Sequence, residues 1–307
     1  MSEDVPHTTI TVSVPAKTNL TLHVGAPRAQ WSGRHELDTI YCAISVRDTV
    51  TATRKRPGSG FSLAIDGDHL GDLASSDLRR NHAVLALFAL AQAAEREPDV
   101  ALHVEKTIPV GAGLAGGSAD AAATLLALNT LWDLHWPIAR LQEVAATLGA
   151  DMPFCLTGGF ARGTGFGERI EHLDEDCETV RALRDRGYAG NVLVGAYNAQ
   201  LSTPDVYRMF DQIGAGAGDD NHLQAAAIRL HPRSGEAIEA AIQAGARHAF
   251  VSGSGPSVIA FTPTAAIAQA VAQAWERARL VDRVIAAHAP AYPHITSAVS
   301  TSYSVRQ

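Results

Sequence analysis

A glycine-rich stretch at residues 108–120, IPVGAGLAGGSAD, carries the clearest chemical signal in this sequence of 307 residues. Its glycines at positions 111, 113 and 116 fit G-x-G-x-x-G, the dinucleotide fingerprint. The stretch also fits the phosphate loop G-x-x-x-x-G-K-[ST], except that Gly117 stands where the lysine belongs, before Ser118. Glycine backbone can approach oxyanions closely, and the N-terminus of a following helix attracts them, so the stretch predicts a phosphate site. A plain turn before a helix is the alternative.

Neither template fits its surroundings. A dinucleotide fold needs an apolar strand buried on both faces before its glycines, whereas His103, Glu105 and Lys106 alternate with apolar residues and Pro109 interrupts the end. No second strand ends in an acidic residue at the required distance, so a nicotinamide oxidoreductase is disfavoured. The phosphate-loop interpretation lacks its lysine and an apolar strand ending in aspartate. What remains is the physics that both templates share.

Two charged residues could act on a phosphate bound there. Lys17, in VPAKTNL, is one of only three lysines among 25 basic residues, and we expect it at a strand–turn–strand junction. It could supply the missing positive charge, or be an ordinary solvated lysine. Asp151, in LGADMPF, follows a helix end and could be a catalytic carboxylate or an N-cap. A second Gly/Ser loop, VSGSGPSVIAF, could be only a hairpin turn.

Hydrophobic periodicity indicates the elements that must position these residues. Strands are expected at 8–24, 39–54, 60–67, 99–109, 159–170 and 191–198, and two more around the Gly/Ser turn within 248–261. Helices are expected after Ser76 or Asp77 as N-cap and before Pro98, from Ser118 to about 134, at 137–149, after Asp151, at 203–213, after a flexible loop at 214–220 and at 264–280. The pattern predicts two α+β domains, residues 1–170 and 191–307, joined by a polar linker at 171–190.

Composition excludes several classes of protein. The net charge of −7 argues against a general nucleic-acid or membrane surface. The acidic N-terminus is unlike a secretory signal, and the longest apolar stretch, from Ala83, is too short to span a bilayer. The three cysteines lie far apart without a C-x-x-C pair, which predicts a reducing cytoplasm and no zinc site.

Taken together, PAKTNL, PVGAGLAGGSAD and SGSGPSVIAF resemble the three motifs of the GHMP kinase superfamily, in order and at appropriate separations. The resemblance covers nearly the whole chain. It implies an α+β, two-domain GHMP kinase fold with a ribosomal-protein-S5-domain-2-like N-terminal domain and a ferredoxin-like C-terminal α/β sandwich. GRHELDTIY, LGADMPFCLTGG, STPDVYRMFD and GDDNHLQ resemble the branch that acts on cytidine diphosphate-linked methylerythritol.

That resemblance implies ATP-dependent phosphorylation of a hydroxyl of this small molecule, giving the 2-phosphate and ADP in non-mevalonate isoprenoid biosynthesis. Lys17 and Asp151 would flank the hydroxyl as catalytic residues, with Asn19 near the acceptor. Cytosine would be recognised by His35 through hydrogen bonds and by Tyr207 through stacking. The phosphates of ATP would lie on Pro109, Val110, Gly111, Ala112, Gly113, Leu114, Ala115, Gly116, Gly117, Ser118 and Ala119.

Further implied assignments are Thr203 as a substrate contact and Ser118 as a ligand of ATP-bound Mg²⁺. Arg34 occupies the usual position of an aromatic ring that closes the cytosine site, and a guanidinium plane can also stack on a base. DNHLQ replaces both acidic residues of the family's N-D-L-E element. The alternatives are a GHMP kinase for mevalonate-type alcohols, homoserine or a sugar, and a non-catalytic binding protein of this fold. A monomer or a homodimer, with no nucleic-acid or membrane partner, is expected.

Overall fold

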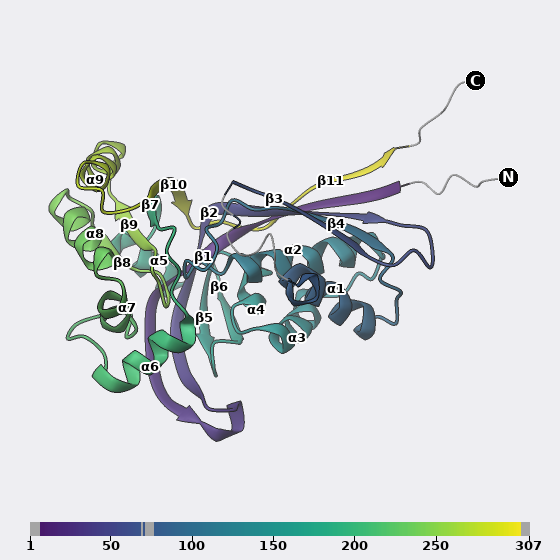
Figure 1. Ribbon diagram of the computed structural model, residues 1–307, viewed down its shortest axis with the longest axis horizontal. Helices are drawn as coiled ribbons and strands as arrows, with labels where there is room; N and C mark the ends of the chain where they lie inside the picture. The colour runs from purple at the N-terminus through teal and green to yellow at the C-terminus, as the bar shows by residue number, and fades with distance from the viewer. Residues whose placement is uncertain (1–6, 69, 71–76, 302–307) are drawn as a thin grey trace.

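The computed structural model describes residues 7–68, 70 and 77–301 and arranges them around two β-sheets (Figure 1). The first sheet contains β1 (His7–Arg28), β2 (Arg34–Arg54), β3 (Ser62–Asp66), β4 (Val100–Glu105), β5 (Phe160–Thr164), β6 (Arg169–Leu173) and β11 (His294–Thr301). Its order is β11-β1-β2-β4-β3, with β5 pairing to β2 and β6 to β5. β3 and β4 are parallel, and the other pairs are antiparallel.

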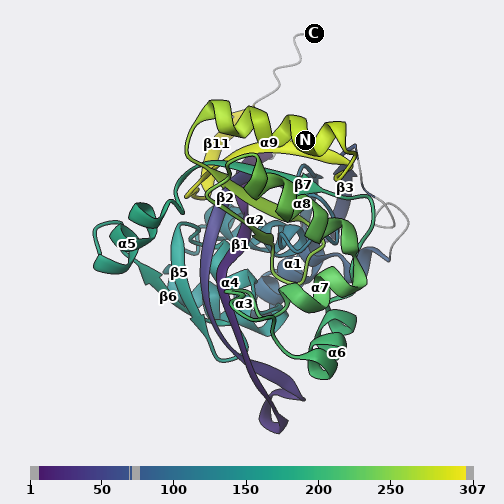
Figure 2. The ribbon, with the colours of Figure 1, turned by 90° about the vertical axis from the view of Figure 1, so that its left-hand side faces the viewer.

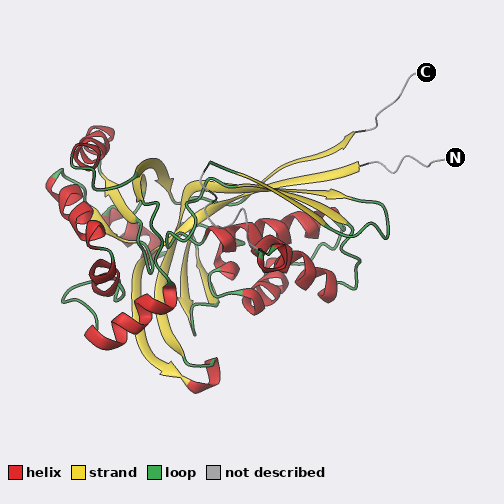
Figure 3. Ribbon diagram, in the orientation of Figure 1, coloured by secondary structure: helices red, strands yellow, loops and turns green. Residues whose placement is uncertain are grey.

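Four helices cover one face of this sheet, as Figures 1 and 3 show: α1 (His82–Ala93), α2 (Gly116–Leu131), α3 (Ile138–Leu148) and α4 (Met152–Cys155). The alternation expected in β4 is confirmed, since Val100, Leu102 and Val104 are buried beneath them. α2 is rich in alanine and leucine on every side and is buried along most of its length. The small side chains let this helix lie close to the strands, which fixes the glycine-rich stretch at its start.

The second sheet has the order β10-β7-β9-β8 and is antiparallel. Its strands are β7 (Gly190–Ala196), β8 (His248–Val251), β9 (Val258–Thr262) and β10 (Arg283–Ala289). The accompanying helices are α5 (Glu178–Arg186), α6 (Thr203–Ile213), α7 (Gln224–Leu230), α8 (Pro232–Gln243) and α9 (Ala265–Arg277). The expected α+β class is therefore confirmed. Among the described residues, no helix is both long and apolar enough to cross a membrane.

The turn expected at PAKTN is wrong, because β1 continues through it. Pro15 and Asn19 resemble turn residues, yet β1 stays paired with β2 through register shifts at Pro15/Ala16 and Asn19/Thr21. Such bulges keep a strand paired while re-aiming its side chains. Figure 2 shows the resulting long β1–β2 ribbon extending beyond the rest of the sheet.

Smaller differences concern element ends. The strand expected at 159–170 is the hairpin of β5 and β6. Of the two proposed caps for the first helix, Ser76 lies outside the described residues, and Asp77 caps a 3-10 turn (Leu78–Arg80) instead. α1 itself starts at His82 with Asn81 as its cap. α2 starts at Gly116, two residues before Ser118.

The division into domains at 171–190 remains a prediction. That segment holds the end of β6 and the whole of α5, so it is ordered secondary structure. The chain also returns to the first sheet at its far end, where β11 pairs with β1 (Figure 1).

Candidate active site

One cavity of about 880 Å³ opens between the two sheets and their helices. β1, β2, the glycine-rich stretch, the loop before α4, the start of α6 and the β8–β9 turn all contribute to it. The predicted site residues that line it are Lys17, Asn19, Arg34, His35, Asp151, Thr203 and Tyr207, with Pro109, Gly111, Ala112, Gly113, Ala115, Gly116, Gly117 and Ser118. Val110, Leu114 and Ala119 are not among the lining residues, and the last two are fully buried in the core.

Lys17 lines the cavity from the bulged part of β1. Its side chain is only 7% exposed, and its Nζ lies 3.4 Å from Oδ2 of Asp151. The same ammonium donates to Oδ1 of Asn19 at 2.8 Å, and the Asn19 amide donates to Thr39 Oγ1 at 2.7 Å. The interpretation of Lys17 as a solvated surface lysine is therefore wrong.

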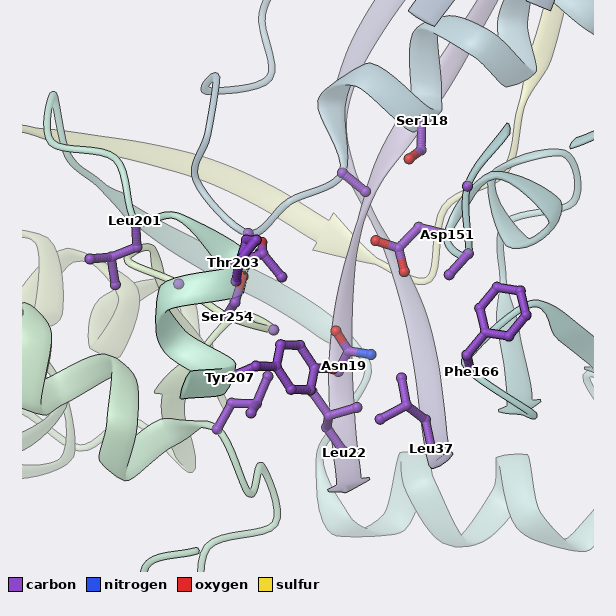
Figure 4. A pocket seen from close by; sticks show the side chains of 18 of the residues that line it. Asn19, Leu22, Leu37, Ser118, Asp151, Phe166, Leu201, Thr203, Tyr207 and Ser254 are labelled. Atoms are coloured by element: carbon purple, nitrogen blue, oxygen red, sulfur yellow. Dashed lines mark hydrogen bonds between the residues drawn. The ribbon is translucent and has the colours of Figure 1, made fainter. Parts of the chain in front are cut away.

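Asp151 precedes α4 but does not cap it, because no backbone N–H of that helix donates to its side chain. Its Oδ1 instead accepts a hydrogen bond of 3.0 Å from the Tyr41 hydroxyl, while Oδ2 faces Lys17. Figure 4 shows the carboxylate between Ser118 and Asn19, with Tyr207 and Phe166 to either side of the view. A half-buried carboxylate therefore faces the space where two substrates could meet.

The glycine-rich stretch delivers the start of α2 to the same cavity. Ala115 adopts a left-handed conformation (φ 57°), and within the described residues no side chain caps the helix. The N–H groups of its first turn, at residues that line the cavity, are thus available to an anion. Gly117 has a steric reason to be glycine, because a Cβ there would lie 2.1 Å from Nδ1 of His82. A lysine at this position would have to displace the imidazole.

The β8–β9 turn holds the glycine-rich stretch from the other side. Ser252 Oγ donates to the Gly113 carbonyl at 3.1 Å, and the backbone N–H of Lys17 donates to the Leu114 carbonyl at 3.1 Å. A Cβ on Gly113 would lie 2.2 Å from the Ser252 carbonyl oxygen. Three segments far apart in the sequence therefore touch at one point, and they are the three motif segments.

Asn221 is the asparagine of the DNHLQ segment, which resembles the N-D-L-E element. Its buried amide donates to the carbonyls of Val251 at 2.9 Å and Gly253 at 2.8 Å. Gly253 in turn packs over Lys17 so closely that a Cβ would lie 3.2 Å from Nζ. Asn221 thus holds the β8–β9 turn against Lys17, and it does so through its own amide, so the acidic residues of N-D-L-E are not needed for that contact.

An aromatic group lies at the other end of the cavity. The rings of His35 and Tyr207 stack with centroids 5.2 Å apart, and Nδ1 of His35 lies 2.8 Å from the Gly25 carbonyl. Asp211 lies 3.4 Å from Nε2 of the same imidazole. Thr203 contacts Ser254 through their hydroxyls at 3.0 Å. This end offers ring faces and hydrogen-bonding groups suited to a nucleobase.

Arg34 does not reach that stack and instead lies over Phe166. Its guanidinium carbon is 4.6 Å from the centroid of the Phe166 ring, in cation–π geometry. Both side chains line the cavity. The position at which the resemblance implies an aromatic ring therefore holds an arginine, which packs on the Phe166 ring.

Comparisons with known proteins agree with this geometry. Residues 81–159 match the model of the GHMP kinase N-terminal domain, and residues 204–282 match the model of the C-terminal domain. The chain belongs to the GHMP kinase family. A 4-diphosphocytidyl-2-C-methyl-D-erythritol kinase of Bifidobacterium adolescentis is 72% identical over 94% of this chain and 95% of its own length. One from Streptomyces avermitilis is 39% identical over 86% of this chain and 92% of its own.

Solved structures confirm the expected GHMP kinase fold. A crystal structure of 4-(cytidine 5′-diphospho)-2C-methyl-D-erythritol kinase superposes with a TM-score of 0.69 at 30% identity, covering 92% of this chain and 99% of that one. A homoserine kinase from Cytophaga hutchinsonii reaches a TM-score of 0.68 at 18% identity, covering 94% and 97%. The second likeness shows the fold alone.

Tyr41, His82 and Phe166 are among the cavity residues of this kinase that the sequence-based prediction did not include. Burial, and then the charge and hydrogen bond of Asp151, raise the pKa of Tyr41 well above its usual range. Burial and the nearby Lys106 lower the pKa of His82. These residues lie outside the three motifs, and an aromatic next to a glycine, as in GTGFGE, is too common a pattern to single out Phe166.

Proposed function

We propose that this kinase transfers the γ-phosphoryl group of ATP to a hydroxyl of 4-diphosphocytidyl-2-C-methyl-D-erythritol, giving the 2-phosphate and ADP. The observation that carries the proposal is the position of the Lys17–Asp151 pair, 3.4 Å apart, between the uncapped start of α2 and the His35–Tyr207 stack. One end of the cavity suits phosphates and the other suits a base. Relatives of up to 72% identity bear the name of this activity.

Each charged group has a part in the transfer. The transition state of phosphoryl transfer is loose and anionic, so catalysis consists mostly of positioning and charge stabilisation. The N–H groups at the start of α2 hold the phosphates of ATP. Asp151 accepts the proton of the attacking hydroxyl, and Lys17 stabilises negative charge on the group in transit. Asn19 holds the Lys17 ammonium in place through their 2.8 Å hydrogen bond.

Mg²⁺ is part of the proposal, and the residues present fit it. Within the described part of the chain, no cluster of three or more His, Cys, Asp or Glu side chains could hold a metal. A site of this kind suits Mg²⁺ that arrives with ATP, since this ion commonly binds substrate phosphates and waters with one or two protein ligands. The Ser118 hydroxyl, which points into the cavity (Figure 4), would be such a ligand. The ion would neutralise phosphate charge.

The cytidyl end of the substrate would lie against Tyr207 and His35. Tyr207 offers a ring face, and burial followed by the Asp151 charge raises its pKa, which keeps its phenol neutral. Thr203 supports the same region through Ser254. Arg34, stacked on Phe166, would supply a second flat surface for the base.

The test is ADP release with the cytidyl substrate, compared with mevalonate, homoserine and a sugar under the same conditions. Turnover dependent on the cytidyl substrate, with the other alcohols near background, is the expected result. Preference for another alcohol would replace the assigned substrate. ATP binding without turnover on any alcohol would indicate a binding protein instead of a kinase.

We also propose that this kinase works in the cytoplasm on small molecules alone. All three cysteines, Cys42, Cys155 and Cys177, are free thiols, as a reducing compartment favours. The oligomeric state, monomer or homodimer, stays a prediction that light scattering would decide.

A further inference from the structure

Tyr41 makes a contact with the catalytic carboxylate that no motif predicted. Its hydroxyl donates to Oδ1 of Asp151 at 3.0 Å and lies 3.3 Å from the carbonyl oxygen of Gly167. A phenol has one proton to donate, and the nearer, charged oxygen is the stronger acceptor. The hydroxyl is thus committed to Asp151.

The ring of Tyr41 is fixed in place, so the hydroxyl is as well. The residue is only 2% exposed, and its ring stacks on Phe154 with centroids 4.8 Å apart and planes inclined by 19°. On β5, a Cβ at Gly163 would lie 2.5 Å from Cε2 of the Tyr41 ring, so only glycine at this position avoids a clash with the ring. A packed aromatic that carries one hydrogen bond is a rigid support for a catalytic group.

The two oxygens of Asp151 therefore have different surroundings. Oδ1 receives the Tyr41 hydroxyl, whereas Oδ2 lies 3.4 Å from Nζ of Lys17, whose shorter hydrogen bond of 2.8 Å goes to Asn19. Oδ2 thus keeps the greater capacity to take up a proton. It is also the oxygen beside the cation that would stabilise the transferring group.

We infer that Tyr41 is a positioning residue of this kinase, which fixes Asp151 through Oδ1 so that Oδ2 receives the proton of the acceptor hydroxyl. The inference rests on the proposed function. In the step, the acceptor O–H bond breaks and its proton passes to Oδ2. The freed electron pair forms the new O–P bond, and the bond between the γ-phosphorus and the bridging oxygen breaks to leave ADP.

The groups that face Asp151 allow the effect to be read from pH dependence. They are Lys17 from β1, Tyr41 from β2, Cys155 from α4 and Tyr207 from α6. Burial raises the pKa of both tyrosines and of the Cys155 thiol, so these three stay neutral where a carboxylate titrates. A change in the acidic limb of the kcat profile would therefore report the carboxylate itself.

The deciding variant is Tyr41→Phe, which removes the hydroxyl and keeps the ring. We expect kcat to fall about tenfold and the acidic limb of its pH profile to move up by about one pH unit, since the ionised carboxylate loses a donor. KM for ATP and for the cytidyl substrate should stay within about twofold, because the ring still lines the cavity. In an Asp151→Asn background, Tyr41→Phe should cause no further loss.

Tyr197→Phe is the matched control. Tyr197 is also 2% exposed, and its hydroxyl donates to the Arg233 carbonyl at 3.3 Å, away from the cavity. Its removal should leave kcat and the pH profile unchanged. An unchanged profile in Tyr41→Phe, or a loss of kcat accompanied only by a lower melting temperature, would overturn the inference. Wild-type protein that does not turn over the cytidyl substrate would overturn the proposed function instead.

Discussion

Lys17 lines the cavity and is closely packed on its other sides, which makes its shape as important as its charge. Asn19 accepts from Nζ, Asp151 lies 3.4 Å away, and the Tyr41 ring centroid is 5.7 Å from the ammonium. Gly253 lies so close that a Cβ there would be 3.2 Å from Nζ. A compact ammonium fits this space, and the carboxylate beside it is the proposed base.

Replacing the base should remove the chemistry and keep the binding. Asp151→Asn preserves the shape of the side chain but cannot accept the proton, so kcat should fall by about 10²–10⁴-fold. ATP affinity, measured by calorimetry, should change little, because the start of α2 is intact. A variant with near wild-type kcat would show that Asp151 is not the base.

Replacing the cation with a wider one should also be severe. In Lys17→Arg the guanidinium fork does not fit between Asn19 and Gly253, and kcat should fall about 10²-fold or more. Lys55→Arg is the control, since Lys55 lies in a loop where it donates to the Gly60 carbonyl at 2.8 Å. Steady-state kinetics of the two variants compare them directly. Nearly normal turnover in Lys17→Arg would remove Lys17 from the mechanism.

The contact between α2 and the first sheet contains a buried charge cluster beneath the phosphate site. Lys106, which follows β4, forms an ion pair with Asp48 of β2 and donates a hydrogen bond of 2.7 Å to Oδ2 of Asp120 of α2. Asp48 also accepts the backbone N–H groups of Thr107 and Ile108 at 2.7 and 2.8 Å. The cluster thereby joins two strands, a helix and the entry to the glycine-rich stretch.

This cluster should make stability depend on pH. Burial raises the pKa of Asp120 to about 8, against the opposing charge of Lys106, and one of its oxygens has no partner among the described residues. An unfolded aspartate titrates near 3.9, so folding takes up a proton between about pH 4 and pH 8. The stability tied to this proton is present below about pH 4 and is lost as pH rises through about 8.

The free energy of unfolding should therefore fall as pH rises from about 4 to about 8. In wild type this slope should be steeper than in Asp120→Asn by up to about 1.4 kcal/mol per pH unit. Urea unfolding at several pH values gives both slopes. Asp185→Asn removes an exposed carboxylate and should keep the wild-type slope. Equal slopes in wild type and Asp120→Asn would contradict the assignment.

At the scale of the whole molecule, the candidate active site forms where the two sheets meet. Ser252, at the edge of the second sheet, contacts Thr18 of β1 at 3.0 Å and the Gly113 carbonyl at 3.1 Å. Buried apolar residues of both sheets also form one continuous cluster. These contacts hold the proposed phosphate site and the proposed base in place relative to each other.

A side chain at Gly113 should push the glycine-rich stretch away from the β8–β9 turn. Gly113→Ala places a Cβ 2.2 Å from the Ser252 carbonyl oxygen and also forces φ +78° on an alanine. We expect a lower melting temperature and a KM for ATP raised about tenfold or more. Gly58→Ala has nearly the same φ, +79°, in open space, and should show only the backbone cost of about 1 kcal/mol. Equal effects of the two variants would mean that the contact is unimportant.

Much of the fold and part of the site could be predicted from local patterns. The alternation in β4, the caps and ends of α3, and the β8–β9 hairpin depend on neighbouring residues, so hydrophobic periodicity and turn residues suffice for them. The continuity of β1 through PAKTN could not be predicted, because pairing with β2 outweighs the local preference of Pro15 and Asn19 for a turn.

The sequence by itself determined the chemistry: an anion-binding glycine stretch, one rare lysine, one aspartate and three motifs in order. Only the tertiary structure decided how these are held. It placed the Tyr41 hydroxyl on Asp151, Phe166 beneath Arg34 and His82 against Gly117. Each of these contacts joins residues far apart in the chain, and it forms because buried polar and aromatic groups need partners that packing alone supplies. No local pattern of residues encodes that choice.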